Sequence, residues 1–418
     1  MPNQALPSLT LQFSAVLMAL GLYGLFGQPT PDNIGVIEIL IAALLLFGAG
    51  VHGLSAFVLK PNSNQADHQL NSWYSAAQCF AVFGLTIPVL MALFSGANIA
   101  ELLRDLIAFV FLLLPLLYAH LYKEGRGFRR LFLFGVVFIG IAFSARIFLP
   151  LIFPHMGMAN AVSLYLTITP AVLFAALYLL AASFLRITAR HGSALYNMGF
   201  GFLIAAVAVL PLLATGFALQ RASVAAVLIF GVLLSIYILI YRPETALRLV
   251  VLFAVLFIAC HPYIHDVFMR LELKHIQVGF NSRGAELRKV IELGTHDIGH
   301  FLFGYGWGAQ FENPAVGKMN VGYTHNIFSY YFFKTGLVGF AMLSFYLLAI
   351  LRNNMKLMRI NLPLALSLLL PLLISSVFYA SHKAFSFGLL LLLVCAITRR
   401  TSLSSVEDAR DLVYSNRS

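Results

Sequence analysis

The sequence predicts an all-α integral membrane protein with about twelve transmembrane helices. Three observations predict this fold: 60% of the 418 residues are hydrophobic, only 10% are charged, and the mean hydropathy is +0.88. A soluble domain could not bury so much apolar surface, so a bilayer must solvate most of this chain. The backbone polar groups of such a chain are satisfied within helices, and lipid covers the apolar side chains.

Apolar runs of roughly 17 to 25 residues are long enough to cross about 30 Å of hydrocarbon. We expect twelve spans, at 9–27, 33–59, 74–96, 101–122, 129–149, 161–185, 195–219, 222–241, 247–263, 326–351, 362–381 and 384–398. The chain then divides into nine helices, a loop, three further helices and a tail, at residues 1–263, 264–325, 326–398 and 399–418. The start, MPNQALPSLT, lacks a basic stretch and a cleavage site, so we expect the first run to be retained.

Lys and Arg in the short connections predict the orientation, because cytoplasmic connections are enriched in them. With a cytoplasmic N-terminus, twelve lie at inner connections and four in the tail, whereas four lie at the outer rims: Arg104, Arg146, Arg221 and Lys383. Both termini are therefore expected in the cytoplasm, with 264–325 as one large periplasmic loop. Snorkelling to the interface explains Arg104 most simply, while Arg146 and Lys383 suit snorkelling or a ligand site equally.

The loop 264–325 contains most of the polar residues with functional potential. Its stretch ELRKVIELG predicts a short helix over the membrane mouth, because the apolar residues recur at helical spacing at Leu287, Val290, Ile291 and Leu293. FGYGWGAQ follows, with glycine at alternate positions Gly304, Gly306 and Gly308. Glycine accepts positive φ and close approach, so this stretch predicts either a plain turn or a backbone that contacts a ligand.

His325 is the strongest candidate for a catalytic residue. It precedes the aromatic, apolar stretch of GYTHNIFSYYFFKTGLVGF, where water gives way to lipid. Imidazole suits proton transfer near neutral pH, and Tyr323 and Asn326 are placed to orient it. The alternative is an interfacial or helix-capping group. Lys334, deeper in the same run, must face protein or a polar cavity, either to support the site or to form an ion pair.

Metal ions, cofactors and nucleic acid are not expected as partners. HPYIH and HDIGH each place two His at i and i+4, which suits a metal, but neither is H-E-x-x-H and Pro262 disturbs the first. The three cysteines lie in apolar runs and predict packing residues. No basic face with interleaved aromatics exists outside the apolar runs. The net charge of +11 instead fits anionic membrane lipids or a phosphate-bearing substrate.

The arrangement resembles the O-antigen ligase and polymerase superfamily of bacterial membrane enzymes. The family's His-Asn at the end of a periplasmic loop, followed by a Gly-x-x-Gly helix, matches His325, Asn326, Gly336 and Gly339. Its loop arginine, followed by a glycine-rich turn, matches Arg288 and the turn that contains Gly306 and Gly308. Its earlier arginine, at the outer start of a helix, matches Arg221 in LQRASVAAVL. NSRGAEL spells that pattern more closely, so Arg283 remains a second candidate.

The resemblance implies a GT-C-like glycosyltransferase of the bacterial inner membrane whose active site faces the periplasm. It implies metal-independent, inverting transfer of O-antigen polysaccharide from undecaprenyl pyrophosphate to a lipid-anchored acceptor, without a cofactor. Arg221 and Arg288, with Arg146, would hold the pyrophosphate, because guanidinium groups bind phosphate oxygens in a fork. His325 would be the general base. The supporting residues would be Tyr323, Asn326, Gly306, Gly308, Arg283 and Lys383.

Several functions remain open at this stage. The modest length and the single large loop favour lipid A-core oligosaccharide as the acceptor, as in the ligases. The polymerases, which join undecaprenyl-linked repeat units, and the protein O-glycosylating ligases are the alternatives within the superfamily. A transporter with Lys334 as its substrate residue is an alternative of another class, although transporter sites lie near the midplane. A metal-dependent hydrolase would use the two His pairs.

Overall fold

The computed structural model describes residues 6–29, 35–57, 70–124, 126–152, 160–189, 192–217, 220–245 and 282–398, with isolated positions between 248 and 273. The regular secondary structure of these residues is helical apart from one two-stranded sheet. Seven helices are long and apolar enough to cross a bilayer: α2 (Val36–Ser55), α3 (Leu70–Phe94), α6 (Arg126–Ile152), α8 (Pro170–Ile187), α9 (Ala194–Phe217), α10 (Arg221–Tyr241) and α14 (Ile327–Ile360). By helix length and hydropathy, the chain is a multi-pass membrane protein.

The remaining elements are shorter or less apolar. Three apolar helices accompany the seven: α1 (Leu6–Phe26), α15 (Leu362–Val377) and α16 (Phe385–Thr398). The other α-helices are α4 (Ile99–Leu112), α5 (Leu114–Leu117), α7 (Asn160–Thr167), α12 (Arg283–Gly294) and α13 (Ile298–Phe303). The 3₁₀ turns are η1 (Ala119–Glu124), η3 (Pro243–Thr245), η4 (Pro314–Val316) and η5 (Ala380–Lys383). Strands β1 (Phe311–Asn313) and β2 (Met319–Val321) form an antiparallel pair.

Two of the expected spans are divided among separate elements, and two others, α2 and α14, are interrupted at Gly50 and Gly336, where φ is positive. The run 101–122 is divided into α4, α5 and η1, because Leu113 leaves the helical conformation before a new helix begins. The run 161–185 is divided between α7 and α8, since Pro170 starts a fresh helix after Thr169. The expected boundary near Arg221 is confirmed, because α9 ends at Phe217 and α10 begins at Arg221. Most of the expected span 247–263 lies outside the described residues.

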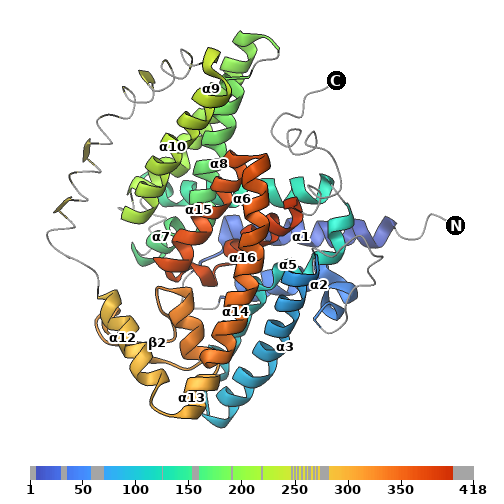
Figure 1. Ribbon diagram of the computed structural model, residues 1–418, viewed down its shortest axis with the longest axis vertical. Coiled ribbons are helices and arrows are strands. Elements are labelled where there is room, and N and C mark those ends of the chain that lie inside the picture. Colours follow the sequence, from blue (N-terminus) through green and yellow to red (C-terminus); the bar gives the residue numbers. More distant parts are fainter. Residues whose placement is uncertain are drawn as a thin grey trace.

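The helices α3 and α14 run side by side, and the loop elements lie across their ends (Figure 1). The core is aromatic where these helices meet α4, since the Phe109 ring contacts both Phe80 and Trp307. On the outer helices, large apolar side chains such as Leu203 and Phe345 are exposed. Such an apolar exterior fits contact with lipid tails.

The helix α14 is broken at Gly336, where φ is +64°. A break of this kind frees backbone carbonyls, which must find other donors when they are buried. Here the freed carbonyls of Phe333 and Lys334 accept hydrogen bonds from the backbone N–H groups of Tyr305 and Gly306, at 3.0 and 2.9 Å. The glycine-rich stretch of the loop therefore completes the hydrogen bonding of a membrane helix.

The same stretch also supplies a hydrogen-bond donor that α3 lacks. Pro88 has no N–H, so the Gly84 carbonyl lacks its helical donor. The indole Nε1 of Trp307 donates to that carbonyl at 2.7 Å, and the Trp307 backbone N–H donates to the Pro88 carbonyl at 3.2 Å. Trp307 is fully buried. The proline and the tryptophan are thus complementary parts of one contact.

The alternating glycines are explained by this packing. Positive φ values at Gly304, Gly306 and Gly308 confirm the predicted backbone conformation. A Cβ on Gly306 would lie 2.5 Å from the Ala92 nitrogen, and one on Gly304 would lie 2.5 Å from the Thr335 nitrogen. We expected these glycines to form a turn or to let the backbone approach a ligand. In the structure, Gly306 lies against the backbone of α3 and Gly308 against that of α4.

We expect Gly306→Ala to destabilise the folded protein more than Gly317→Ala. Both glycines have positive φ, but a Cβ at Gly317 meets nothing within 4 Å. The Gly317 substitution should cost roughly 1 kcal/mol through backbone strain alone, and the Gly306 substitution about 2 kcal/mol more through overpacking. Thermal unfolding of the purified protein in detergent measures both. Equal losses in the two variants would contradict the packing role.

Candidate functional site

His325 lies immediately before α14, at the end where the loop meets the helices (Figure 1). The next residue, Asn326, is the N-cap of this helix, and its Oδ1 accepts a hydrogen bond from the Phe328 N–H at 2.8 Å. An asparagine cap satisfies one of the free N–H groups at a helix start. The cap fixes the backbone direction at His325, so Asn326 acts through the backbone rather than through the imidazole.

Glu286 of α12 binds His325 through both carboxylate oxygens. Oε2 lies 2.7 Å from Nδ1 of the ring, and Oε1 accepts from the His325 backbone N–H at 2.7 Å. The carboxylate is almost fully buried, while the imidazole is 24% exposed. Because a carboxylate can only accept, Nδ1 carries the proton, and Nε2 of the neutral ring has a lone pair available. A base oriented by a carboxylate in this way is suited to proton transfer.

The surroundings of Glu286 keep it ionised. Burial raises the pKa of this carboxyl, but the hydrogen bonds from His325 and the electrostatic interaction with it lower the pKa more, with a further contribution from Asn313. The net pKa of Glu286 lies below its ordinary value. Asn313, at the end of β1, donates to Glu286 Oε2 at 3.0 Å and to the Tyr323 carbonyl at 3.2 Å. The small sheet, which the sequence did not predict, thus positions the carboxylate.

Tyr323 contacts His325 through its ring, as expected for a residue that restricts the imidazole. The two rings meet edge to face with centroids 5.9 Å apart, and Tyr323 is buried. Its backbone carbonyl, rather than its hydroxyl, takes part in the Asn313 contact.

Arg283 begins α12 and is half-buried. Its guanidinium lies close enough to interact electrostatically with Tyr379 and Glu286, and burial lowers its pKa. The Tyr379 hydroxyl is 3.4 Å from Ser223 Oγ in the first turn of α10. Arg221, at the first position of α10, precedes Ser223 by two residues. The first turn of α10, Tyr379 and the first turn of α12 therefore lie close together, and α12 contacts His325 through Glu286.

Arg288 does not reach this place, contrary to the expectation. Glu286 and Val290 are buried on one face of α12, and Arg283 shares that face, whereas position 288 is about 200° around the helix from position 286. Arg288 is exposed, and its Nε donates back to the Gly284 carbonyl at 3.3 Å. The geometry therefore favours Arg283 over Arg288 as the loop arginine of this site.

Arg146 also lies elsewhere, at the end of α1. Its Nη1 donates to the Gly27 carbonyl at 2.7 Å and to the Gly24 carbonyl at 3.4 Å, where the last turn of the helix leaves acceptors free. The guanidinium carbon is 5.5 Å from the centre of the Phe143 ring. These contacts give Arg146 a structural role that does not involve His325.

A buried charge cluster lies below the loop and consists of Glu101, Arg104, Asp105, Lys334 and Lys383. Asp105 accepts from Lys334 at 2.6 Å, from Lys383 at 3.0 Å, from Arg104 Nε at 3.3 Å and from the Gly308 N–H at 2.9 Å. Lys334 and Asp105 are both 0% exposed, which confirms that Lys334 faces protein. Snorkelling was the wrong explanation for Arg104, which is buried and also pairs with Glu101. Lys383 belongs to this cluster rather than to the His325 contacts.

The HDIGH histidines have local partners. Asp297 caps α13 through the His300 N–H, and hydrogen bonds from His300 lower its pKa to about 2. The His300 ring stacks on Tyr305 with centroids 4.0 Å apart. Within the part of the chain that the structure describes, no group of three or more His, Cys, Asp or Glu side chains is arranged to hold a metal ion.

Glu286 is the site residue that we did not identify from the sequence. It is 39 residues from His325, so only the fold brings the two together. A weak signal was present, since Arg283 and Glu286 are spaced i and i+3 and would share one face if the predicted helix began three residues earlier, as α12 does. The exposed position 288 is out of phase with both.

No family model, no curated protein and no solved structure matched the chain in our comparisons. The fold and the site by themselves define a class. The chain is a multi-pass membrane protein in which a carboxylate orients a histidine at the N-terminal end of a long helix.

The depressed pKa of Glu286 predicts a pH-dependent contribution to stability. The unfolded chain binds more protons than the folded one between the folded-state pKa and the ordinary value of 4.5. The stabilisation is therefore present above pH 4.5 and lost as the pH falls through the folded-state pKa. We expect Glu286→Gln to lower stability near pH 7, with a gap to the wild type that closes in acid. Denaturation of both proteins across this pH range measures the gap.

The control for this experiment is Glu312→Gln, because Glu312 is an exposed carboxylate of the same loop. It should change stability little at any pH. A gap for Glu286→Gln that widens as the pH falls below 4.5 would contradict the assignment.

Proposed function

We propose that this chain is an inverting glycosyltransferase of the bacterial inner membrane that transfers O-antigen polysaccharide from undecaprenyl pyrophosphate to lipid A-core oligosaccharide. The proposal includes twelve spans, cytoplasmic termini, a GT-C-like architecture and a site that faces the periplasm. The main support for the proposal is the pairing of His325 with the buried carboxylate of Glu286 at the N-terminal end of α14. The motif resemblance around His325 and Asn326 supplies the reaction class.

In this mechanism, Nε2 of His325 takes the proton of an acceptor sugar hydroxyl as that oxygen attacks the anomeric carbon of the donor. The bond from the anomeric carbon to the pyrophosphate oxygen breaks, and its electron pair leaves with the pyrophosphate. Direct displacement inverts the anomeric centre. Glu286 stabilises the imidazolium that forms, as the carboxylate does in other His-carboxylate pairs. General base catalysis contributes about 10² to 10⁴ in rate.

The leaving pyrophosphate gains negative charge, which needs cations outside the Glu286–His325 pair. Arg283 is the described cation nearest to this role, because it interacts with Glu286 and Tyr379 on the inner face of α12. Arg221 at the start of α10 is its partner in the proposal. A guanidinium group can bind two phosphate oxygens at once and stays charged at neutral pH. Such electrostatic stabilisation of the leaving group is often the largest contribution to catalysis.

Two alternatives differ in their support. A polymerase would use the same site with an undecaprenyl-linked acceptor, so the choice of acceptor separates it from a ligase. A transporter would need Lys334 to bind its substrate, but this ammonium group is fully buried against Asp105 and donates to the Ala309 carbonyl. The contacts of Lys334 therefore favour a structural role.

We expect His325→Ala and Glu286→Gln to slow transfer by about 10² to 10⁴ without unfolding the protein, because one removes the base and the other its orientation. Purified protein would be assayed in vesicles with an undecaprenyl-pyrophosphate glycan, chelator, and either lipid A-core or a second undecaprenyl-linked unit. His296→Ala is the control, since His296 is 82% exposed in the same loop. Wild-type rates in His325→Ala would rule out the base, and preference for the second acceptor would indicate a polymerase.

We expect Arg283→Ala to reduce turnover at saturating donor by about tenfold or more, the order of one lost charge-assisted contact in a buried site. Arg288→Ala should retain the wild-type rate, because its side chain is exposed and turned away from His325. The two variants remove the same charge from the same helix, which makes them a matched pair. A larger loss in Arg288→Ala would return the assignment to that residue.

A further inference from the structure

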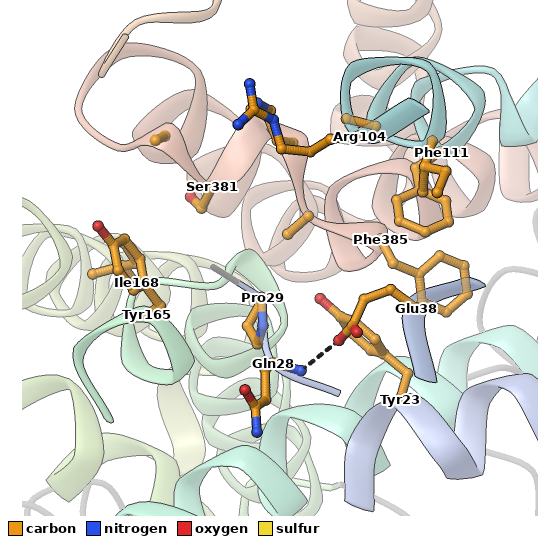
Figure 2. A pocket seen from close by; sticks show the side chains of 15 residues that line it. Tyr23, Gln28, Pro29, Glu38, Arg104, Phe111, Tyr165, Ile168, Ser381 and Phe385 are labelled. Carbon is orange, nitrogen blue, oxygen red and sulfur yellow. Dashed lines mark hydrogen bonds between the residues drawn. The ribbon is translucent and has the colours of Figure 1, made fainter. Parts of the chain in front are cut away.

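A cavity of about 60 Å³ lies between the side of α4, the ends of α1 and α7, the start of α2 and the turn η5 (Figure 2). Its polar lining includes Gln28, Glu38, Arg104, Ser381 and Lys383. Figure 2 shows Arg104 and Ser381 along one side and Gln28 and Pro29 across from them. Most of the remaining wall is aromatic or aliphatic. The cavity therefore combines a basic end with apolar sides.

The basic end of the cavity is formed by two buried cations, Arg104 and Lys383. Arg104 and Lys383 are only 6% and 9% exposed. Among the described side chains, both cations contact the Asp105 carboxylate, which Lys334 also contacts. Electrostatic attraction is strong where water is excluded. The cavity borders the two cations, so an anion placed in it would be attracted by both.

Glu38 on the opposite wall is occupied by other partners. Its carboxylate oxygens accept from the backbone N–H groups of Gln28 and Gly35, at 2.8 and 3.0 Å. Arg146 is also near enough to interact with it electrostatically. The carboxylate thus has its own donors and its own cation.

A second observation points to a ligand. Ser381 lines the cavity and is 6% exposed, yet its Oγ has no hydrogen-bond partner among the described residues. Buried hydroxyl groups are nearly always hydrogen-bonded, because an unsatisfied one costs free energy. A hydroxyl and two cations that line one cavity form a donor set suited to phosphate oxygens.

We propose that this cavity binds a phosphate group, held by Arg104, Lys383 and Ser381. This site uses other residues than the Glu286–His325 pair. The turn η5 contributes to both regions, since Lys383 and Ser381 line the cavity while the neighbouring Tyr379 contacts Ser223 and interacts with Arg283. The phosphate is either free in solution or the headgroup of a lipid whose chains extend along the apolar walls. This inference does not rest on the transferase proposal.

The test measures ligand affinity of the full chain in detergent by native mass spectrometry and thermal shift. The probes are dioleoyl phosphatidic acid, inorganic phosphate, and dioleoylglycerol as the lipid without phosphate. We expect phosphatidic acid, inorganic phosphate or both to bind, and dioleoylglycerol not to. Binding of phosphatidic acid alone assigns the site to a lipid headgroup. Binding of inorganic phosphate with equal affinity assigns it to the free ion.

Two variants probe the cavity without removing a charge. Ala108→Leu fills it from α4, and Ser381→Ala removes the hydroxyl. Each should weaken phosphate binding about tenfold or more, the order of one charge-assisted hydrogen bond. Ala225→Leu, on an exposed position of α10, is the matched control and should bind as the wild type does. No binding by either phosphate probe, equal binding by dioleoylglycerol, or unchanged affinity in both cavity variants would overturn the proposal.

Discussion

The Asp105 carboxylate is the point on which the described structure depends. It joins four segments: Arg104 lies on its own helix α4, Lys334 on α14, Lys383 on η5, and Gly308 in the loop. In an interior of low dielectric, breaking such a network leaves uncompensated charges, which costs far more than the loss of an exposed ion pair. The loop is therefore fixed to the helices by charge as well as by the apolar contacts of Trp307.

This constraint also sets the position of the histidine. Lys334 and His325 belong to the same end of α14, and Gly336 interrupts the helix just beyond them. The glycine-rich stretch satisfies the carbonyls at the break, so the first turns of α14 behave as part of the loop assembly rather than of the long helix. Glu286 then holds His325 from the opposite direction. The imidazole is fixed from both sides by residues that are distant in sequence.

The sequence was sufficient for features that depend on local pattern. Hydrophobic runs predicted a membrane protein, the spacing in ELRKVIELG predicted α12, and alternating glycines predicted positive φ. It was insufficient where partners are far apart: Glu286 with His325, Trp307 with Gly84, and the buried charge cluster. The expected position of Arg288 near His325 is not observed for a related reason, because spacing along the chain does not show which face of a helix is buried. The breaks at Leu113 and Gly336 depend on tertiary contacts that hydropathy does not record.

The double contact of Glu286 has a mechanical consequence. One carboxylate accepts hydrogen bonds from both the ring and the backbone amide of His325. These two contacts restrict rotation about the side-chain bonds of His325 and movement of its backbone. Any displacement of α12 would carry the ring with it as one body. In the proposed transfer, the acceptor hydroxyl would therefore have to align itself with an imidazole that the protein already holds in place.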